Sequence, residues 1–149
     1  MLTISPEDPT SADAQALMEE LSSTLAHITG DSGKASFDPD HVRVARACFV
    51  MARDAEKRAV GCGAFRPLQE GIAEVKRMYS RPGTSGVGSA ILAYLEAAAA
   101  GFGYRTLWLE TRLVNERAVS FYQRRGYRRI PNFGKYAGSP KAVCFEKRL

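Results

Sequence analysis

The 149-residue sequence predicts an α+β domain built on a mixed sheet. Three apolar, strand-like segments come first, and segments of alternating strand and helix character follow them. The helical segments carry apolar residues at intervals of three and four, which marks one buried face on each helix. A content of 45% hydrophobic and 25% charged residues is typical of a globular protein, so we expect residues 1–149 to form a single domain.

The first half of the chain predicts one helix and a β-meander. Residues 2–5 form a short first strand, and Pro9-Thr-Ser11 introduces a helix with a weak capping box of Thr10 and Asp13. The apolar face of this helix consists of Ala14, Leu17, Met18, Leu21 and Leu25. A polar loop or short helix follows over residues 30–39. Apolar runs at 47–52, 59–65 and 72–79 then predict three antiparallel strands.

The second half alternates between helices and strands. Gly126 is a natural left-handed helix stop, and the asparagine at 115 is a favourable helix cap. The predicted order is a helix from Ser89 to about Gly103, a strand over 105–111, a short helix from Asn115 to Gly126, and strands over 127–130 and 142–147.

Cysteine and histidine content narrows the possible chemistry. The three cysteines, Cys48, Cys62 and Cys144, lie in apolar stretches, which favours buried reduced thiols over a disulfide framework or a catalytic thiol. His27 and His41 have no paired ligand spacing, so we expect no metal site.

The net charge of +5 favours anionic partners. Much of the excess lies in residues 123–129, a cluster that is usually a solvated helix end. No nucleic-acid-binding motif accompanies it, so we expect no nucleic acid partner. No apolar run approaches the roughly 18 residues of a membrane span, and the first residues lack a signal-peptide pattern. We therefore expect no membrane association and a cytoplasmic location.

A glycine-rich segment between a predicted strand and a predicted helix, Arg81-Pro-Gly-Thr-Ser-Gly-Val-Gly-Ser89, is the first candidate for chemistry. Free amides at a helix start bind anions, and glycines let the backbone approach a ligand closely. A nucleotide P-loop would need lysine and serine or threonine where Ser89-Ala90 stand. A dinucleotide fingerprint fails because Ile91 takes the place of the third glycine. Phosphate binding and a plain glycine-rich turn both stay open.

A second motif, Asn115-Glu-Arg-Ala-Val-Ser-Phe-Tyr-Gln-Arg-Arg-Gly-Tyr127, has the form N-x-x-A-x-x-F-Y-x-x-x-G-Y. Together with the glycine-rich segment upstream, it resembles the GNAT superfamily of N-acetyltransferases over most of the chain. Three further stretches are similar to a bacterial subgroup whose substrates are mostly unassigned. These are Ala73–Tyr79, Leu109–Thr111 and Phe133–Ala137 continuing to Val143–Lys147.

The resemblance implies a GNAT-like acyl-CoA N-acyltransferase fold, with a mostly antiparallel, twisted sheet of about six or seven strands flanked by about four helices. It also implies acetyl-CoA as co-substrate, with its pantetheine arm in a gap between the strand ending at Met78-Tyr79 and the strand over 106–111. Amides of residues 85–89 would hold the pyrophosphate, and an amide near Met78 would stabilise the oxyanion. The implied cofactor-binding residues are Met78, Tyr79, Gly83, Thr84, Ser85, Gly86, Val87, Gly88, Ser89, Asn115 and Phe121.

The sequence offers two candidate catalytic residues, the first of them through the same resemblance. Tyr122 would protonate the leaving thiolate, and its alternative is a core aromatic on a helix. Glu74 is the candidate general base for the protonated amine, and its alternative is a surface carboxylate paired with Lys76 or an arginine. We also consider Arg66, Phe133 and Tyr136 at the border of an acceptor pocket, although packing or solvation is the better explanation for each of them.

The chain departs from the family in its glycine-rich segment. Gly83 stands where the family usually carries arginine or glutamine, three residues before the first glycine of Gly86-Val87-Gly88. Main-chain amides, with Arg81 as a candidate, are left to bind the pyrophosphate. We expect an N-acetyltransferase that acts on a primary amine of a small substrate, by direct attack in a ternary complex, with a homodimer as one possible assembly. The alternative is a catalytically weak or inactive acyl-CoA-binding regulatory module.

Overall fold

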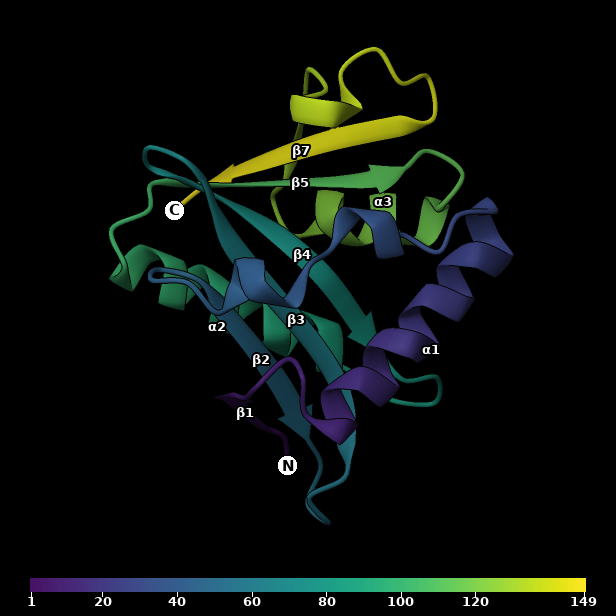
Figure 1. Ribbon diagram of the computed structural model, residues 1–149, viewed down its shortest axis with the longest axis vertical. Helices are drawn as coiled ribbons and strands as arrows, with labels where there is room; N and C mark the ends of the chain where they lie inside the picture. Colours follow the sequence, from purple (N-terminus) through teal and green to yellow (C-terminus); the bar gives the residue numbers. More distant parts are fainter.

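Seven strands form one twisted sheet in the order β1-β2-β3-β4-β5-β7-β6 in the computed structural model, which describes residues 1–149 (Figure 1). The strands are β1 (Thr3–Pro6), β2 (Cys48–Arg53), β3 (Ala59–Gln69), β4 (Ile72–Ser80), β5 (Thr106–Arg112), β6 (Arg128–Ile130) and β7 (Ala142–Arg148). All neighbours are antiparallel except β4 and β5. The predicted mixed, mostly antiparallel sheet is therefore confirmed.

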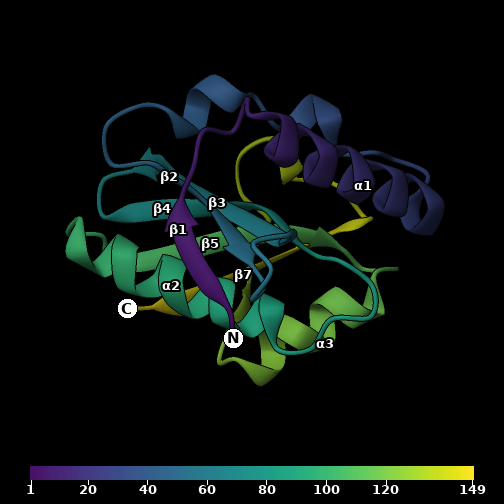
Figure 2. The ribbon, with the colours of Figure 1, turned by 90° about the horizontal axis from the view of Figure 1, so that it is seen from below.

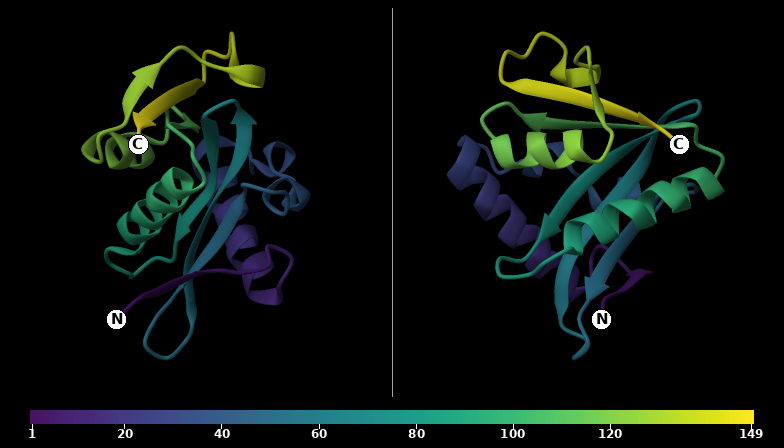
Figure 3. Two further views of the ribbon diagram at one scale, coloured as in Figure 1. Left: turned by 90° about the vertical axis from the view of Figure 1, so that its left-hand side faces the viewer. Right: turned by 180° about the vertical axis from the view of Figure 1, so that it is seen from behind.

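Three α-helices cover the two faces of the sheet: α1 (Ala12–Thr29), α2 (Val87–Gly101) and α3 (Glu116–Arg124). Figure 2 shows α1 on one face and α2 and α3 on the other, and Figure 3 shows the latter two in front of the sheet when it is seen from behind. Three short 3-10 helices complete the fold: Lys34–Ser36, Pro39–Val42 and Gly134–Tyr136. The three α-helices are close to the expected number of about four. None of the helices combines the length and the apolar character needed to cross a membrane.

Each face of the sheet has its own hydrophobic core, because β2 and β3 are buried on both sides. Phe49 and Met51 pack with Leu17 and its neighbours on α1, whereas Val50 and Phe65 pack with the apolar side of α2. Strands buried on both faces read as continuous apolar runs, which is the pattern that the sequence shows over 47–52 and 59–65.

Helix ends follow the residues that favour them, with two corrections. The Ser11 hydroxyl accepts a hydrogen bond from the Ala14 amide (3.2 Å), so Ser11 is the N-cap of α1. The predicted capping box of Thr10 and Asp13 is wrong, because Thr10 instead donates to Asp8. Helix α2 begins two residues earlier than predicted, since Gly86, at φ 74°, is its N-cap.

Strands β4 and β5 pair over only a short distance. The parallel register joins residues 72–74 of β4 to residues 106–108 of β5, and its last pair is Glu74 with Trp108. Beyond this pair β4 continues beside β3 alone, and β5 continues beside β7 alone, so the two strands diverge (Figure 1). The sheet is thus forked at Glu74, as the family resemblance implies.

Two glycines of β3 let α2 lie directly against the strand. A Cβ atom at Gly61 would lie 2.6 Å from Cγ1 of Val87 and 2.8 Å from the carbonyl oxygen of Tyr79. A Cβ atom at Gly63 would lie 2.7 Å from Cγ2 of Ile91. Glycine at these positions therefore holds the start of α2 close to β3 and to the diverging end of β4.

We predict that Gly61→Ala lowers the free energy of unfolding by about 1–3 kcal/mol, because the added methyl group meets a β-branched side chain and a backbone carbonyl that cannot rotate away. Urea denaturation of both variants measures the effect. Gly101→Ala is the matched control, since a Cβ atom there meets no atom within 4 Å. Equal stability changes in the two variants would show that this close approach is not a packing constraint.

Candidate functional site

A cleft of about 650 Å³ lies where β4 and β5 diverge, and α1, α2 and α3 supply its remaining walls. Of the residues predicted for the site, all but Ser85 line this cleft. These are Glu74, Met78, Tyr79, Gly83, Thr84, Gly86, Val87, Gly88, Ser89, Asn115, Phe121 and Tyr122. Residues from β4 and from the later motif, which are distant in sequence, thus meet in one cavity.

The start of α2 presents a row of free backbone amides to this cleft. The first hydrogen bond of the helix runs from the Ala90 amide to the Gly86 carbonyl (3.1 Å), and no side chain caps the helix. The amides of residues 85–89 donate to no protein acceptor, whereas the Thr84 amide donates to the Arg81 carbonyl (3.3 Å). Unpaired amides at the positive end of a helix dipole form an anion site, and they suit a diphosphate.

The structure does not bring the Arg81 guanidinium to these amides. Its Nε atom donates to Glu20 on α1 at 3.0 Å and its Nη1 atom donates to the Ala59 carbonyl at 2.9 Å. The same carboxylate accepts a hydrogen bond from the hydroxyl of Tyr79 (3.1 Å). The side chains of Arg81 and Tyr79 are therefore held toward α1, and only the Tyr79 backbone remains available to the other side of the strand.

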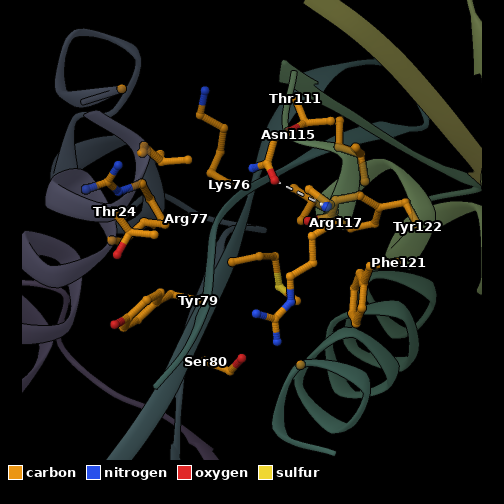
Figure 4. Close-up of a pocket in the computed structure, with 18 of the residues that line it drawn as sticks. Thr24, Lys76, Arg77, Tyr79, Ser80, Thr111, Asn115, Arg117, Phe121 and Tyr122 are labelled. Carbon is orange, nitrogen blue, oxygen red and sulfur yellow. Dashed lines mark hydrogen bonds between the residues drawn. The ribbon is translucent and has the colours of Figure 1, made fainter. Parts of the chain in front are cut away.

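Asn115 and Phe121 come from α3, on the side of β4 opposite to Arg77 and Tyr79 (Figure 4). The Asn115 side-chain oxygen caps α3 by accepting from the Ala118 amide (3.3 Å), which confirms the predicted cap. Its side-chain NH₂ group remains unpaired and lines the cleft. The Phe121 ring would lie 3.2 Å from a Cβ atom at Gly88, so glycine at 88 allows the ring to reach the start of α2.

Tyr122 lies partly in the core and partly at the cleft. Its side chain packs at edge-to-face distances of 5.1 Å from Phe121 and 5.6 Å from Tyr127, measured between ring centroids. Burial raises the pKa of its hydroxyl, so the phenol is protonated at neutral pH. The expected acid role and the alternative of a core aromatic are therefore compatible in one residue.

Glu74 is buried rather than on the surface, with 3% of its side chain exposed. Its carboxylate lies 3.0 Å from Nε of Arg66 and 3.6 Å from Nζ of Lys76. Glu74 is therefore not a surface carboxylate, but it does form the ion pairs with Lys76 and an arginine that this alternative included. As the last residue of β4 that pairs with β5, Glu74 holds a charged group at the base of the fork.

A second, partly buried carboxylate, Glu110 of β5, was missed in the sequence. It lines the cleft and forms an ion pair with Arg112 (2.7 Å). Burial raises the pKa of Glu110, and burial also lowers the pKa of Lys76, whose Nζ donates to the Tyr136 hydroxyl (3.3 Å). The alternation of β5 was the available signal, since Leu107 and Leu109 face α2 and leave residue 110 on the face of Glu74.

The three residues considered for the acceptor border have different positions. Tyr136 lines the cleft, whereas Arg66 bonds Glu74 from outside it. Phe133 also lies outside, where it packs against Trp108 with a centroid separation of 5.0 Å.

Arginines of the 115–127 motif also face the cleft, although the sequence indicated a solvated helix end. Arg117, Arg124 and Arg125 line the cavity, and Arg117 extends along it beside Phe121 (Figure 4). None of the three forms an ion pair with a carboxylate.

The cysteines are free and buried, as their apolar surroundings predicted. Cys62 has no exposed surface, and burial raises the pKa of its thiol to about 12. None of the three lines the cleft, and no group of three histidine, cysteine or acidic side chains is arranged to hold a metal ion.

Comparison with known proteins agrees with this geometry. A sequence model of the acetyltransferase (GNAT) family matches residues 14–127, which include the first helix, the fork and the second motif. The chain belongs to the GNAT family. A search of the curated proteins finds no match.

Solved structures of GNAT proteins share the fold along the whole chain. A candidate acyl-CoA N-acyltransferase from Klebsiella pneumoniae is 32% identical, with a TM-score of 0.84, and the match covers 100% of this chain and 98% of that one. A GNAT acetyltransferase from Staphylococcus aureus is 14% identical, with a TM-score of 0.79 and coverage of 100% and 99%. One from Elizabethkingia anophelis, solved with acetyl-CoA bound, is 15% identical, with a TM-score of 0.72 and coverage of 99% and 98%.

Proposed function

We propose that this GNAT protein is a single-domain N-acetyltransferase that transfers the acetyl group of acetyl-CoA to a primary amine of a small substrate. One observation carries the proposal: a single cleft extends from the free amides at the start of α2, through the fork, to the carboxylates of Glu74 and Glu110. An anionic carrier and a cationic amine therefore have complementary groups at opposite ends of one cavity. The acetyl-CoA bound by the Elizabethkingia relative supports the choice of carrier.

The end of the cleft at the start of α2 would bind acetyl-CoA and take no part in proton transfer. Amides of residues 85–89 would donate hydrogen bonds to the diphosphate, and the unpaired Asn115 amide and the Phe121 ring would line the pantetheine arm. The backbone of Met78, at the diverging end of β4, would donate to the oxyanion that forms as the amine attacks the thioester carbonyl. The fork supports this role, because β4 beyond Glu74 has an edge that no strand of the sheet covers.

The end of the cleft at Glu74 would take up the proton that the amine substrate loses. An amine arrives as an ammonium ion, and it must lose a proton before its lone pair can attack the carbonyl carbon. Glu74 would take this proton, directly or through water. The carbon–sulfur bond then breaks, the thiolate leaves with its electron pair, and Tyr122 would donate the proton that converts it to free CoA. The second proton that the nitrogen loses on forming the amide would restore the Tyr122 phenolate to a phenol. The products are the N-acetyl amide and CoA thiol.

Direct attack in a ternary complex fits the absence of a cysteine thiol from the cleft. A covalent acetyl-enzyme would require a reactive thiol or an activated hydroxyl within reach of the thioester. The cysteines lie outside the cleft, and the high pKa of Cys62 keeps it in the unreactive thiol form.

A second candidate function is an acyl-CoA-binding regulatory module with weak or no turnover. The observation in its favour is that residues 82–89 include no arginine, lysine or glutamine to contact the diphosphate. The two functions share ligand binding and differ in turnover, so they can be separated by experiment.

Acetyl-CoA is expected to raise the melting temperature, because a ligand of the native state stabilises it by an amount that grows with the logarithm of ligand concentration over Kd. Thiol release from acetyl-CoA, measured with a broad panel of primary amines, then tests turnover. No thermal shift at millimolar acetyl-CoA would reject both functions. A shift without thiol release for any amine would favour the regulatory module.

Tyr122→Phe is expected to lower kcat by about 10²–10⁴-fold while the Kd for acetyl-CoA changes little, because only the proton donor is lost and the ring packing is kept. Tyr94→Phe is the control, since it removes a tyrosine hydroxyl outside the cleft. Unchanged turnover of Tyr122→Phe would remove this residue from the mechanism.

Glu74→Gln is expected to lower kcat by a similar factor, because glutamine cannot accept the proton that the ammonium group must lose. Glu110→Gln is the matched comparison, as it neutralises another carboxylate of the same cleft. A loss of kcat in Glu110→Gln together with a near-wild-type kcat in Glu74→Gln would transfer the base role to Glu110.

A further inference from the structure

The segment that leads into α2 supplies amides for a diphosphate but no cation. Residues 82–89 contain no lysine or arginine. The nearest arginine in sequence, Arg81, donates to both oxygens of the Glu20 carboxylate, and this ion pair holds its charge on the α1 side of β4. A diphosphate carries negative charge on both phosphoryl groups, so a cation near these amides must come from another element.

Arg125 reaches the first turn of α2 from the end of α3. Its Nε atom donates to Oγ of Ser89 at 3.0 Å, and its Nη2 atom donates to the same oxygen. Its Nη1 atom donates to the Phe121 carbonyl at 3.1 Å, and the guanidinium lies 3.8 Å from the centroid of the Phe121 ring. The guanidinium is therefore fixed within one residue of the free amides.

The contacts that hold Arg125 do not exhaust its donors. A guanidinium has an N–H at Nε and two at each terminal nitrogen. The bonds to Ser89 and Phe121 leave one N–H on each terminal nitrogen, and no carboxylate neutralises the charge. Arg117 and Arg124 also line the cleft, but both are exposed and make no hydrogen bond to the protein through their side chains. Of these three arginines, Arg125 is thus the one that protein contacts hold at the start of α2.

We infer that Arg125 binds the diphosphate of acetyl-CoA, together with the amides at the start of α2, and supplies the charge that the glycine-rich segment lacks. The inference rests on the proposed use of acetyl-CoA. A planar guanidinium matches the spacing of phosphoryl oxygens, and a side chain held in place before binding loses little entropy when the ligand arrives. Ser89 is accordingly a positioning residue that orients Arg125 through its hydroxyl.

The test compares Arg125→Gln with the wild-type protein by isothermal titration calorimetry, with acetyl-CoA and with 3′-dephospho-CoA as ligands. Loss of a charge-assisted contact weakens binding by about tenfold or more. We expect Kd to rise by this factor for both ligands, because both retain the diphosphate. Arg125→Lys keeps the positive charge but lacks the planar guanidinium, so we expect its Kd to lie between those of the wild type and Arg125→Gln.

Arg129→Gln is the matched control, since it makes the same change of charge at an exposed site outside this cleft, and its Kd should equal that of the wild type. Equal Kd values for Arg125→Gln and the wild type would overturn the inference. So would a loss that disappears with 3′-dephospho-CoA, because Arg125 would then contact the 3′-phosphate instead. If the wild-type protein binds neither ligand, the proposed function fails first, and the role of Arg125 fails with it.

Discussion

The divergence of β4 from β5 after the pair of Glu74 and Trp108 is the constraint on which the rest of the site depends. A β-sheet normally satisfies the edges of its inner strands by continuous pairing, and an uncovered inner edge is costly unless water or a ligand occupies it. Here β7 pairs with the far side of β5 and β3 pairs with the far side of β4, so neither strand needs the other beyond residue 74. The edges that remain free face the cleft. Polar backbone is thereby exposed to a ligand in the middle of a buried sheet, without a loop of irregular structure.

The close contact between α2 and β3 adds a second requirement. Gly61 and Gly63 remove side chains that would keep the helix away from the strand, and the start of α2 therefore lies beside the diverging end of β4. Its free amides and the fork would otherwise be separate features. The same arrangement brings α3 alongside, because Gly88 leaves room for the Phe121 ring. Three elements that are distant in sequence are thus held around one cavity by the absence of side chains at three positions.

Local patterns predicted the strands, the helices and the glycine-rich segment, and the motif around Asn115 predicted one wall of the cleft. These features depend on residues close in sequence, such as the Asn115 cap and the apolar alternation of β2 and β3. The misplaced details depend on distant partners. Arg81 was a candidate for the diphosphate, but its partner Glu20 lies on α1, far away in sequence, and Glu110 was overlooked because its importance arises only when β5 lies beside β4. The run of arginines at 124–125 was interpreted as solvated, since no local pattern indicates which loop it faces.

The distribution of charge separates the two ends of the cleft. Near the fork, on the α1 side, both carboxylates have cationic partners: Arg66 and Lys76 beside Glu74, and Arg112 beside Glu110. Such pairing makes a carboxylate tolerable inside the protein. On the α3 side, arginines line the cleft with no acidic partner. Part of the net charge of +5 therefore lies where a polyanionic carrier would bind, and a compact phosphate ligand accounts for it without an extended nucleic-acid surface.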